Sequence, residues 1–203
     1  MELEDLEMYV QIIGAVAGLF TLSVAIINIL RSLTRPAGRL EGSRRPLNWP
    51  FIALGILMFF GAGVAFWKSL PVDLSNWVRM AALGLGSLLY YSGIVLYLWG
   101  MHTLRDMFGA SSGFGVKLYA DHRLVEHGPY AYVRHPMYLA VILSGLGGML
   151  IYRTWSMTLF AVGMFGLVVR AKREEQILEK EFGSDWSAYK KRVPGWFPRF
   201  KKS

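Results

Sequence analysis

The feature that most constrains this chain is a series of long apolar runs without any Asp, Glu, Lys or Arg. Three of these runs cover residues 8–30, 49–67 and 80–101. Each is long enough to cross roughly 30 Å of hydrocarbon as a helix that rises about 1.5 Å per residue. With 54% hydrophobic residues, the whole chain is also more apolar than a usual soluble domain. The sequence therefore predicts an integral membrane protein.

Two shorter apolar runs, residues 136–152 and 154–169, are separated by Arg153 alone. Each falls slightly below the usual length of a spanning helix, so a tight helical hairpin and a re-entrant pair are both open. We favour the hairpin, because small residues would let its two helices approach closely. These residues are Gly145, Gly147, Gly148, Gly163 and Gly166. The expected fold is all-α, with about five transmembrane helices including this short hairpin.

The charged residues predict how the chain is oriented. Basic residues follow the first apolar run, in the loop 31–48, and gather again in 102–135 and 170–203. The positive-inside rule therefore places the N-terminus outside and the C-terminus in the cytoplasm. The net charge of +8 suits anionic lipid headgroups, and we expect no nucleic acid as a partner. The acidic first seven residues are unlike a signal peptide, which indicates that the first run is a retained helix.

These assignments divide the chain into two parts. Residues 1–101 hold three transmembrane helices and the basic loop 31–48. Residues 102–203 hold a loop 102–135, the hairpin 136–169 and a cytoplasmic tail 170–203. The tail begins as an amphipathic helix that Gly183 breaks or bends. The second part carries the residues from which chemistry can be built.

Metal and thiol chemistry are not expected. The chain has no cysteine, which excludes disulfides and thiolate ligands. All four histidines lie between residues 102 and 135, but none of them form the His-x-x-x-His pair of a helical metal site. We therefore predict no metal site.

An anion site is predicted where the hairpin begins. Pro136 suits the first position of a helix, which leaves the amides of the opening turn free for an anion. Arg134 and His135 stand beside the same point. The alternative is that Arg134 and His135 simply lie at the membrane interface.

A cation site is predicted where the last apolar run ends. On a helix, Arg170 and Glu174 are four residues apart and share a face, whereas Glu175 projects about 100° away from Glu174. A solvated run of charges is the alternative. The hairpin would bring 134–138 and 170–175 together, and their opposite preferences fit the carboxylate, ammonium and sulfonium of S-adenosylmethionine.

In these residues the sequence resembles the isoprenylcysteine carboxyl methyltransferase family, which is related to the phospholipid methyltransferases. The matching residues lie between about 100 and 198. They are His-Arg-Leu-Val at 122–125, Gly-Pro-Tyr at 128–130, Arg-His-Pro-Met-Tyr at 134–138, Arg170, Glu-Glu at 174–175, Phe-Gly at 182–183, Tyr189 and Arg-Val-Pro at 192–194. The chain has fewer spans than eukaryotic members, so it is similar to a short prokaryotic type in the cell membrane.

The resemblance implies S-adenosylmethionine as cofactor and assigns a role to each matching residue. The residues that would line its adenine and ribose, largely through backbone atoms, are His122, Arg123, Leu124 and Val125. Those that would hold its amino-acid end are Tyr130, His135, Pro136, Met137 and Tyr138, with Glu174 on the ammonium. Arg170 would face the methyl acceptor, and Glu175 would lie near the reacting centre.

The function we expect is methyl transfer to a lipophilic or membrane-associated acceptor, with a prenylcysteine-like carboxylate favoured. The partners would be membrane lipid and a lipophilic or lipidated acceptor. A phospholipid or small amine or thiol methyltransferase uses the same site and stays an alternative. An NADPH-dependent membrane reductase and a non-enzymatic scaffold are more distant alternatives.

Overall fold

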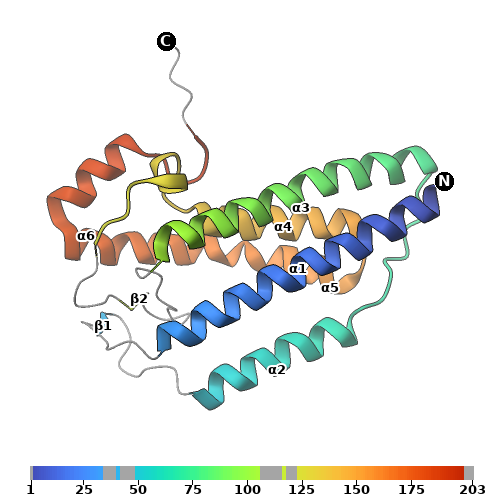
Figure 1. Ribbon diagram of the computed structural model, residues 1–203, viewed down its shortest axis with the longest axis horizontal. Helices are drawn as coiled ribbons and strands as arrows, with labels where there is room; N and C mark the ends of the chain where they lie inside the picture. The colour runs from blue at the N-terminus through green and yellow to red at the C-terminus, as the bar shows by residue number, and fades with distance from the viewer. Residues whose placement is uncertain (1, 34–39, 42–48, 106–115, 118–122, 199–203) are drawn as a thin grey trace, which may run out of the picture. The chain divides into compact units, whose positions relative to one another are not determined.

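The regular secondary structure of the described residues is helical apart from one pair of two-residue strands. The computed structural model (Figure 1) describes residues 2–33, 40–41, 49–105, 116–117 and 123–198. Its elements are α1 (Leu3–Leu33), β1 (Leu40–Glu41), α2 (Trp49–Ala65), α3 (Asn76–Leu104), β2 (Val116–Lys117), η2 (Gly128–Ala131), α4 (Pro136–Tyr152), α5 (Trp155–Met164) and α6 (Gly166–Arg192). The strands pair antiparallel, Leu40 with Lys117. The predicted helical fold is confirmed.

The first four apolar runs each correspond to a helix, and the fifth, 154–169, covers α5 and the start of α6. Three stretches are long and apolar enough to cross a membrane, namely Leu3–Arg31, Asn76–Leu104 and Trp155–Arg192. The shorter apolar helices are Ala53–Ala65 within α2, and α4, which has the predicted bounds. Large apolar side chains on α1, α2 and α3 are exposed, as expected for helices that face lipid. The chain is therefore an integral membrane protein.

The described chain forms two compact units. The first comprises Met1–Leu22, Leu47–Val95 and Ala140–Phe165, and the second comprises Ser23–Pro46, Leu96–Leu139 and Gly166–Ser203. Because α1, α3 and α4 each contribute residues to both units, neither unit is a continuous piece of sequence. The predicted boundary between the transmembrane part, 1–101, and the part that carries the chemistry, 102–203, concerns function rather than packing, so it stays a prediction.

In the first unit, glycines of α4 permit close packing on two sides. A Cβ at Gly145 would lie 3.3 Å from the Cα of Ala161 on α5, so α4 and α5 form the predicted hairpin. Gly147 instead faces α3, where an added Cβ would lie 2.6 Å from the carbonyl oxygen of Gly86. The prediction that Gly147 serves the hairpin was therefore wrong, because it lies on a different face of α4 from Gly145.

The other two hairpin glycines also differ from expectation. Among the described residues, an added Cβ at Gly163 or Gly166 would meet no atom within 4 Å, so neither glycine serves a close helix contact there. Only Gly145 and Gly148, three residues apart and hence on one face of α4, meet α5.

The hairpin turn is fixed to the rest of the first unit by an ion cluster. Arg153, at the turn, has a φ of 48° and donates from Nη2 to Glu7 Oε1 at 2.9 Å. Arg79 donates to the same carboxylate, with Nη2 2.6 Å from Oε2. Backbone bonds tie the turn to the chain after α2, including Leu70 N–H to Arg153 O at 2.8 Å. We call Glu7, Arg79 and Arg153 the Glu7 cluster.

In the second unit, the long helix α6 turns back at Gly183. Its φ of 49° and ψ of −112° interrupt the helix, which confirms the predicted break. Glycine suits this position because its φ lies in the left-handed half of the map. The end of α6 then packs on its own first half through a buried group of Trp186, Tyr189 and Val193, against which Leu178, Phe182 and Leu124 pack. This fold brings the C-terminal residues to the segment before α4.

Candidate functional site

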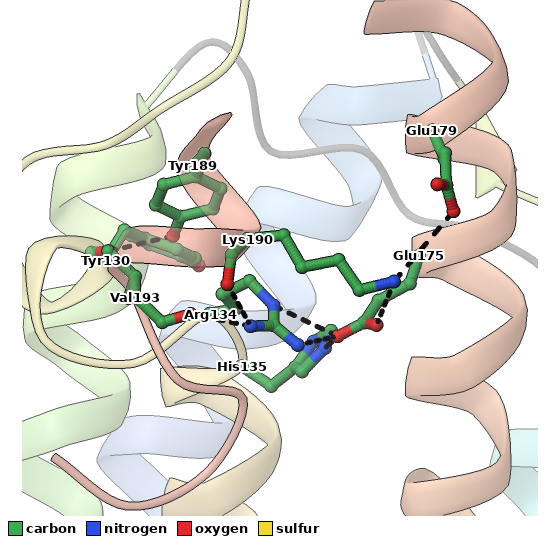
Figure 2. Close-up of polar contacts among 8 residues, drawn as sticks. All are labelled: Tyr130, Arg134, His135, Glu175, Glu179, Tyr189, Lys190 and Val193. Carbon is green, nitrogen blue, oxygen red and sulfur yellow. Dashed lines mark hydrogen bonds and ion pairs between the residues drawn. The ribbon is translucent and has the colours of Figure 1, made fainter. Parts of the chain in front are cut away.

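The two side chains of the predicted anion site, Arg134 and His135, meet Glu175 of α6 (Figure 2). Arg134 donates to Glu175 Oε1 from Nη2 at 2.7 Å and from Nε at 3.1 Å. His135 Nε2 lies 2.9 Å from the same oxygen. A carboxylate only accepts hydrogen bonds, so Nε2 of His135 carries the hydrogen. The expectation that 134–138 and 170–175 come together is therefore confirmed.

These partners keep Glu175 ionised. The residue lies beyond the apolar part of its helix, and its side chain is 18% exposed. Arg134 and His135 donate hydrogen bonds to its carboxylate, and such bonds favour the ionised form. Lys190 Nζ lies 3.7 Å from Oε2 and adds a second positive charge beside that of Arg134. Glu175 is thus a firmly held anion and a weak base. We call Glu175, Arg134, His135 and Lys190 the Glu175 cluster.

Arg134 and His135 are not open to an external anion in the way that the sequence suggested. Their backbone amides donate to the carbonyl oxygens of Pro194, at 2.9 Å, and Gly195, at 3.1 Å. Their side chains are engaged by Glu175. The sequence could not show this, because which of two adjacent carboxylates faces Arg134 depends on the rotation of α6 about its axis.

Glu174 faces a different group of residues. The Tyr138 hydroxyl accepts a hydrogen bond from Arg170 Nε at 2.9 Å and lies near the carboxylate of Glu174. Arg170 also lies over the Tyr138 ring, with Cζ 5.9 Å from the ring centre. Tyr138 therefore adjoins both charged residues. Within the part of the chain that the structure describes, Glu174 makes no ion pair.

Tyr130 lies close to Glu174. Burial, followed by the negative charge of Glu174, raises the pKa of Tyr130 well above its usual range. The Tyr130 carbonyl oxygen accepts a hydrogen bond from the Tyr189 hydroxyl at 2.7 Å, which fixes the short helix η2 to α6. Tyr130 and Tyr138 thus place two neutral phenol rings beside one carboxylate.

Three of the remaining predicted residues, Pro136, Met137 and Leu124, are packed within the protein. Pro136 is fully buried, and Met137 packs on Gly100 of α3, where an added Cβ would lie 2.9 Å from Met137 Cγ. Leu124 packs on the buried group of Trp186, Tyr189 and Val193. Such packing leaves only the backbone of Leu124 for a ligand. Arg123 is exposed and Val125 half-buried, and His122 lies outside the described residues.

Sequence reasoning missed the part played by the chain after α6. Lys190 was treated only as one of many basic residues, and Trp196 was not considered. The Trp196 ring centre lies 5.5 Å from that of His135, whose other aromatic neighbour, Tyr138, stacks at 5.8 Å. No local pattern marks Trp196, because its contact depends on the turn at Gly183.

Comparison with known proteins agrees with this geometry. The family of phospholipid methyltransferases matches residues 81–185 of the chain. A protein-S-isoprenylcysteine O-methyltransferase of Schizosaccharomyces pombe is 37% identical over 84 residues, which are 38% of this chain and 34% of that protein. A steroid 5-alpha-reductase of Solanum lycopersicum is 27% identical over 118 residues, which are 58% of this chain and 42% of that protein.

The chain therefore matches between about a third and two fifths of the length of these curated relatives. The family match covers more than half of the chain and includes Tyr130, Arg134 to Tyr138, Arg170, Glu174 and Glu175. On that match the chain belongs to the phospholipid methyltransferase family, in agreement with the resemblance to isoprenylcysteine carboxyl methyltransferases that the sequence shows.

Proposed function

We propose that this protein is a membrane methyltransferase that uses S-adenosylmethionine to methylate a lipophilic or membrane-associated acceptor. The observation that carries the proposal is the position of Glu174, a carboxylate with no ion pair among the described residues, beside Tyr130 and Tyr138. The family membership supports the same reaction.

The donor set around Glu174 fits S-adenosylmethionine. A carboxylate attracts the ammonium of its amino-acid end, and phenol rings attract cations over their faces. The Tyr138 ring already holds one cation, the guanidinium of Arg170, in this way. S-adenosylmethionine, when bound, supplies a methyl group on a positively charged sulfur. The chain's own part is to bind, orient and exclude water.

Arg170 is the residue that we assign to the acceptor. Tyr138 holds it through Nε, on the helix face it shares with Glu174. A guanidinium beside the donor can orient a carboxylate without any proton transfer. The role of Glu175 is indirect, since three basic side chains surround its carboxylate.

The electrostatics favour a carboxylate as acceptor. An amine or thiol has to lose a proton, and Glu175, whose carboxylate already accepts hydrogen bonds from Arg134 and His135, is poorly placed to take it. A carboxylate needs no base, and a site with little water favours the merging of opposite charges. A prenylcysteine-like carboxylate therefore comes first, and phospholipid or small amine and thiol acceptors come second.

We place the protein in a prokaryotic cell membrane with its N-terminus outside and its C-terminus in the cytoplasm. The basic loops on one side of the apolar runs support this orientation. The site then opens to the compartment that supplies soluble cofactors, and the acceptor reaches it from the lipid.

The proposal is tested by binding of S-adenosylhomocysteine to the purified protein in detergent. Glu174→Gln should weaken binding by about tenfold to a hundredfold, because a hydrogen bond to a charged group is lost. Glu181→Gln is the matched control, since Glu181 is an exposed carboxylate on the same helix. Equal affinity of Glu174→Gln and wild type would contradict the assignment of Glu174.

The acceptor is identified in a second experiment. The purified protein is incubated with radiolabelled S-adenosylmethionine and, separately, a prenylcysteine, a phospholipid extract and small amines or thiols. We expect label in the prenylcysteine as a base-labile ester. Label in phospholipid or amine alone would support transfer but contradict the preference for a carboxylate.

A membrane reductase is the second candidate, because the Solanum lycopersicum relative is a steroid 5-alpha-reductase. The reductase and the methyltransferase differ in the soluble ligand that they bind. Binding of NADPH in place of S-adenosylhomocysteine would favour the reductase and end the methyltransferase proposal.

A further inference from the structure

The chain after α6 is fastened to the turn that precedes α4 by backbone and side-chain contacts. The amides of Arg134 and His135 donate to the carbonyl oxygens of Pro194 and Gly195, at 2.9 and 3.1 Å. Arg134 Nη1 donates to the Val193 carbonyl oxygen and, at 3.4 Å, to that of Lys190. A four-residue segment, Val193 to Trp196, is thus held at several points. We call it the C-terminal strap.

Arg134 connects the C-terminal strap to α6. One edge of its guanidinium, Nε and Nη2, binds Glu175, while Nη1 binds the strap. The planar guanidinium, with five donors in a fixed geometry, can hold two partners at a set angle, which a lysine cannot do. The side chain of Arg134 is only 11% exposed, so its donors are used within the protein.

Trp196 completes the surroundings of His135. The His135 ring is 5% exposed and contacts the rings of both Tyr138 and Trp196. The Tyr138 ring, on which His135 stacks, carries the hydroxyl that accepts from Arg170 and lies near Glu174. Any movement of the strap therefore reaches the residues to which we assign cofactor and acceptor.

We propose that the C-terminal strap is a positioning element of the methyl-transfer site, with Arg134 holding the strap in place and Trp196 holding the His135 and Tyr138 rings. The proposal rests on the proposed function. It assigns a role to Trp196, which lies beyond the family match that ends at residue 185. Trp196 acts through His135 and Tyr138, so it is a positioning residue rather than a catalytic one.

Trp196→Ala, in the full-length protein in detergent, is the first test. We expect the dissociation constant of S-adenosylhomocysteine to rise by about tenfold, because an aromatic contact next to the site is lost. Trp196→Phe, which keeps a ring, should restore most of the affinity. The matched control is Phe197→Ala, since Phe197 is the next residue and is 76% exposed. Equal affinity of Trp196→Ala and wild type would overturn the proposal.

Hydrogen exchange tests the fastening without any ligand. In wild type the amides of Arg134 and His135 should exchange slowly, because the strap carbonyl oxygens accept from them. Arg134→Gln should speed their exchange by more than about tenfold, while amides of α4 beyond its first turn stay protected. Unchanged exchange would overturn the role of Arg134.

The two experiments separate the inference from the proposed function. If wild type binds S-adenosylhomocysteine and Trp196→Ala binds it equally well, the function stands and the strap has no positioning role. If wild type does not bind S-adenosylhomocysteine, both the function and the positioning role are rejected, even where exchange shows that the strap is fastened.

Discussion

Each unit of this protein contains a carboxylate held by two basic side chains, yet the two clusters have different surroundings. Glu7, with a side chain 8% exposed, is bound by Arg79 and Arg153. Glu175, with a side chain 18% exposed, is bound by Arg134 and His135. Next to Glu175 in sequence is Glu174, which faces phenol rings and makes no ion pair among the described residues. No described residue plays such a part beside Glu7.

The comparison teaches that buried ion pairing alone does not mark a functional site. Removing one partner of a buried pair destabilises a protein whether or not chemistry happens there. What distinguishes the Glu175 cluster is that it fixes the helix carrying Glu174 and Arg170. The Glu7 cluster fixes the hairpin turn, where hydrogen bonds join Arg153 to Leu70 and Trp155 to Lys68.

The largest expected effect comes from Glu7→Gln. The change leaves two guanidiniums facing each other without a counter-charge, so it should destabilise the protein by about 3 kcal/mol. The midpoint of thermal unfolding in detergent should fall clearly, while the folded protein binds S-adenosylhomocysteine as wild type does.

Glu175→Gln is the partner experiment for Glu7→Gln. It should weaken binding of S-adenosylhomocysteine by about tenfold, since Arg134 and His135 lose the anion that fixes them. Its effect on the unfolding midpoint should be smaller than that of Glu7→Gln, because Glu175 is less buried. The comparison breaks if Glu7→Gln abolishes ligand binding by folded protein while Glu175→Gln leaves it intact.

The two units can also be compared by removing one tyrosine hydroxyl from each. Tyr138→Phe removes the hydroxyl that accepts from Arg170 and lies near Glu174, and should slow methyl transfer by about tenfold, because the lost bond involves a charged group. Tyr152→Phe removes a bond of 2.8 Å to the Gln11 carbonyl oxygen in the first unit. It should cost about 1 kcal/mol of stability and leave transfer unchanged. Equal transfer rates for the two variants would remove Tyr138 from the site.

The sequence predicts the parts of the molecule that depend on local pattern. Uncharged runs give the helices, and α4 has the bounds that its charges and Pro136 indicate. The approach of Arg134 and His135 to α6 follows from a short hairpin. These features are predictable because hydropathy and chain length decide them.

The rest depends on how helices are rotated about their axes and on contacts between distant residues. Glu174 and Glu175 are equivalent in the sequence until packing turns one toward Arg134 and the other toward Tyr138. Glu7 belongs to an acidic N-terminus whose partners lie 72 and 146 residues further along the chain. Trp196 reaches His135 only because Gly183 turns α6 back. No local pattern carries that information.

The smallest expected effect is at Arg153, where two variants distinguish the loss of the bond to Glu7 from the backbone strain of a positive φ. This residue has a φ of 48°, a conformation that glycine adopts more easily than alanine. Both Arg153→Ala and Arg153→Gly lose the bond to Glu7, but only alanine keeps the backbone strain. Arg153→Gly should therefore be more stable than Arg153→Ala by about 0.5–1 kcal/mol, although glycine is also more flexible in the unfolded chain.

The control for Arg153 is an ordinary helical position, where alanine should be more stable than glycine. Ala188 is an exposed residue of α6, and Ala188→Gly should lower stability by about 1 kcal/mol. Unfolding midpoints of the four proteins, including wild type, in one detergent make the measurement. If glycine is no better than alanine at residue 153, the hairpin turn stores no strain. The Glu7 cluster would then hold the turn by charge alone, and its likeness to the Glu175 cluster would extend to the way in which both fix a segment of chain.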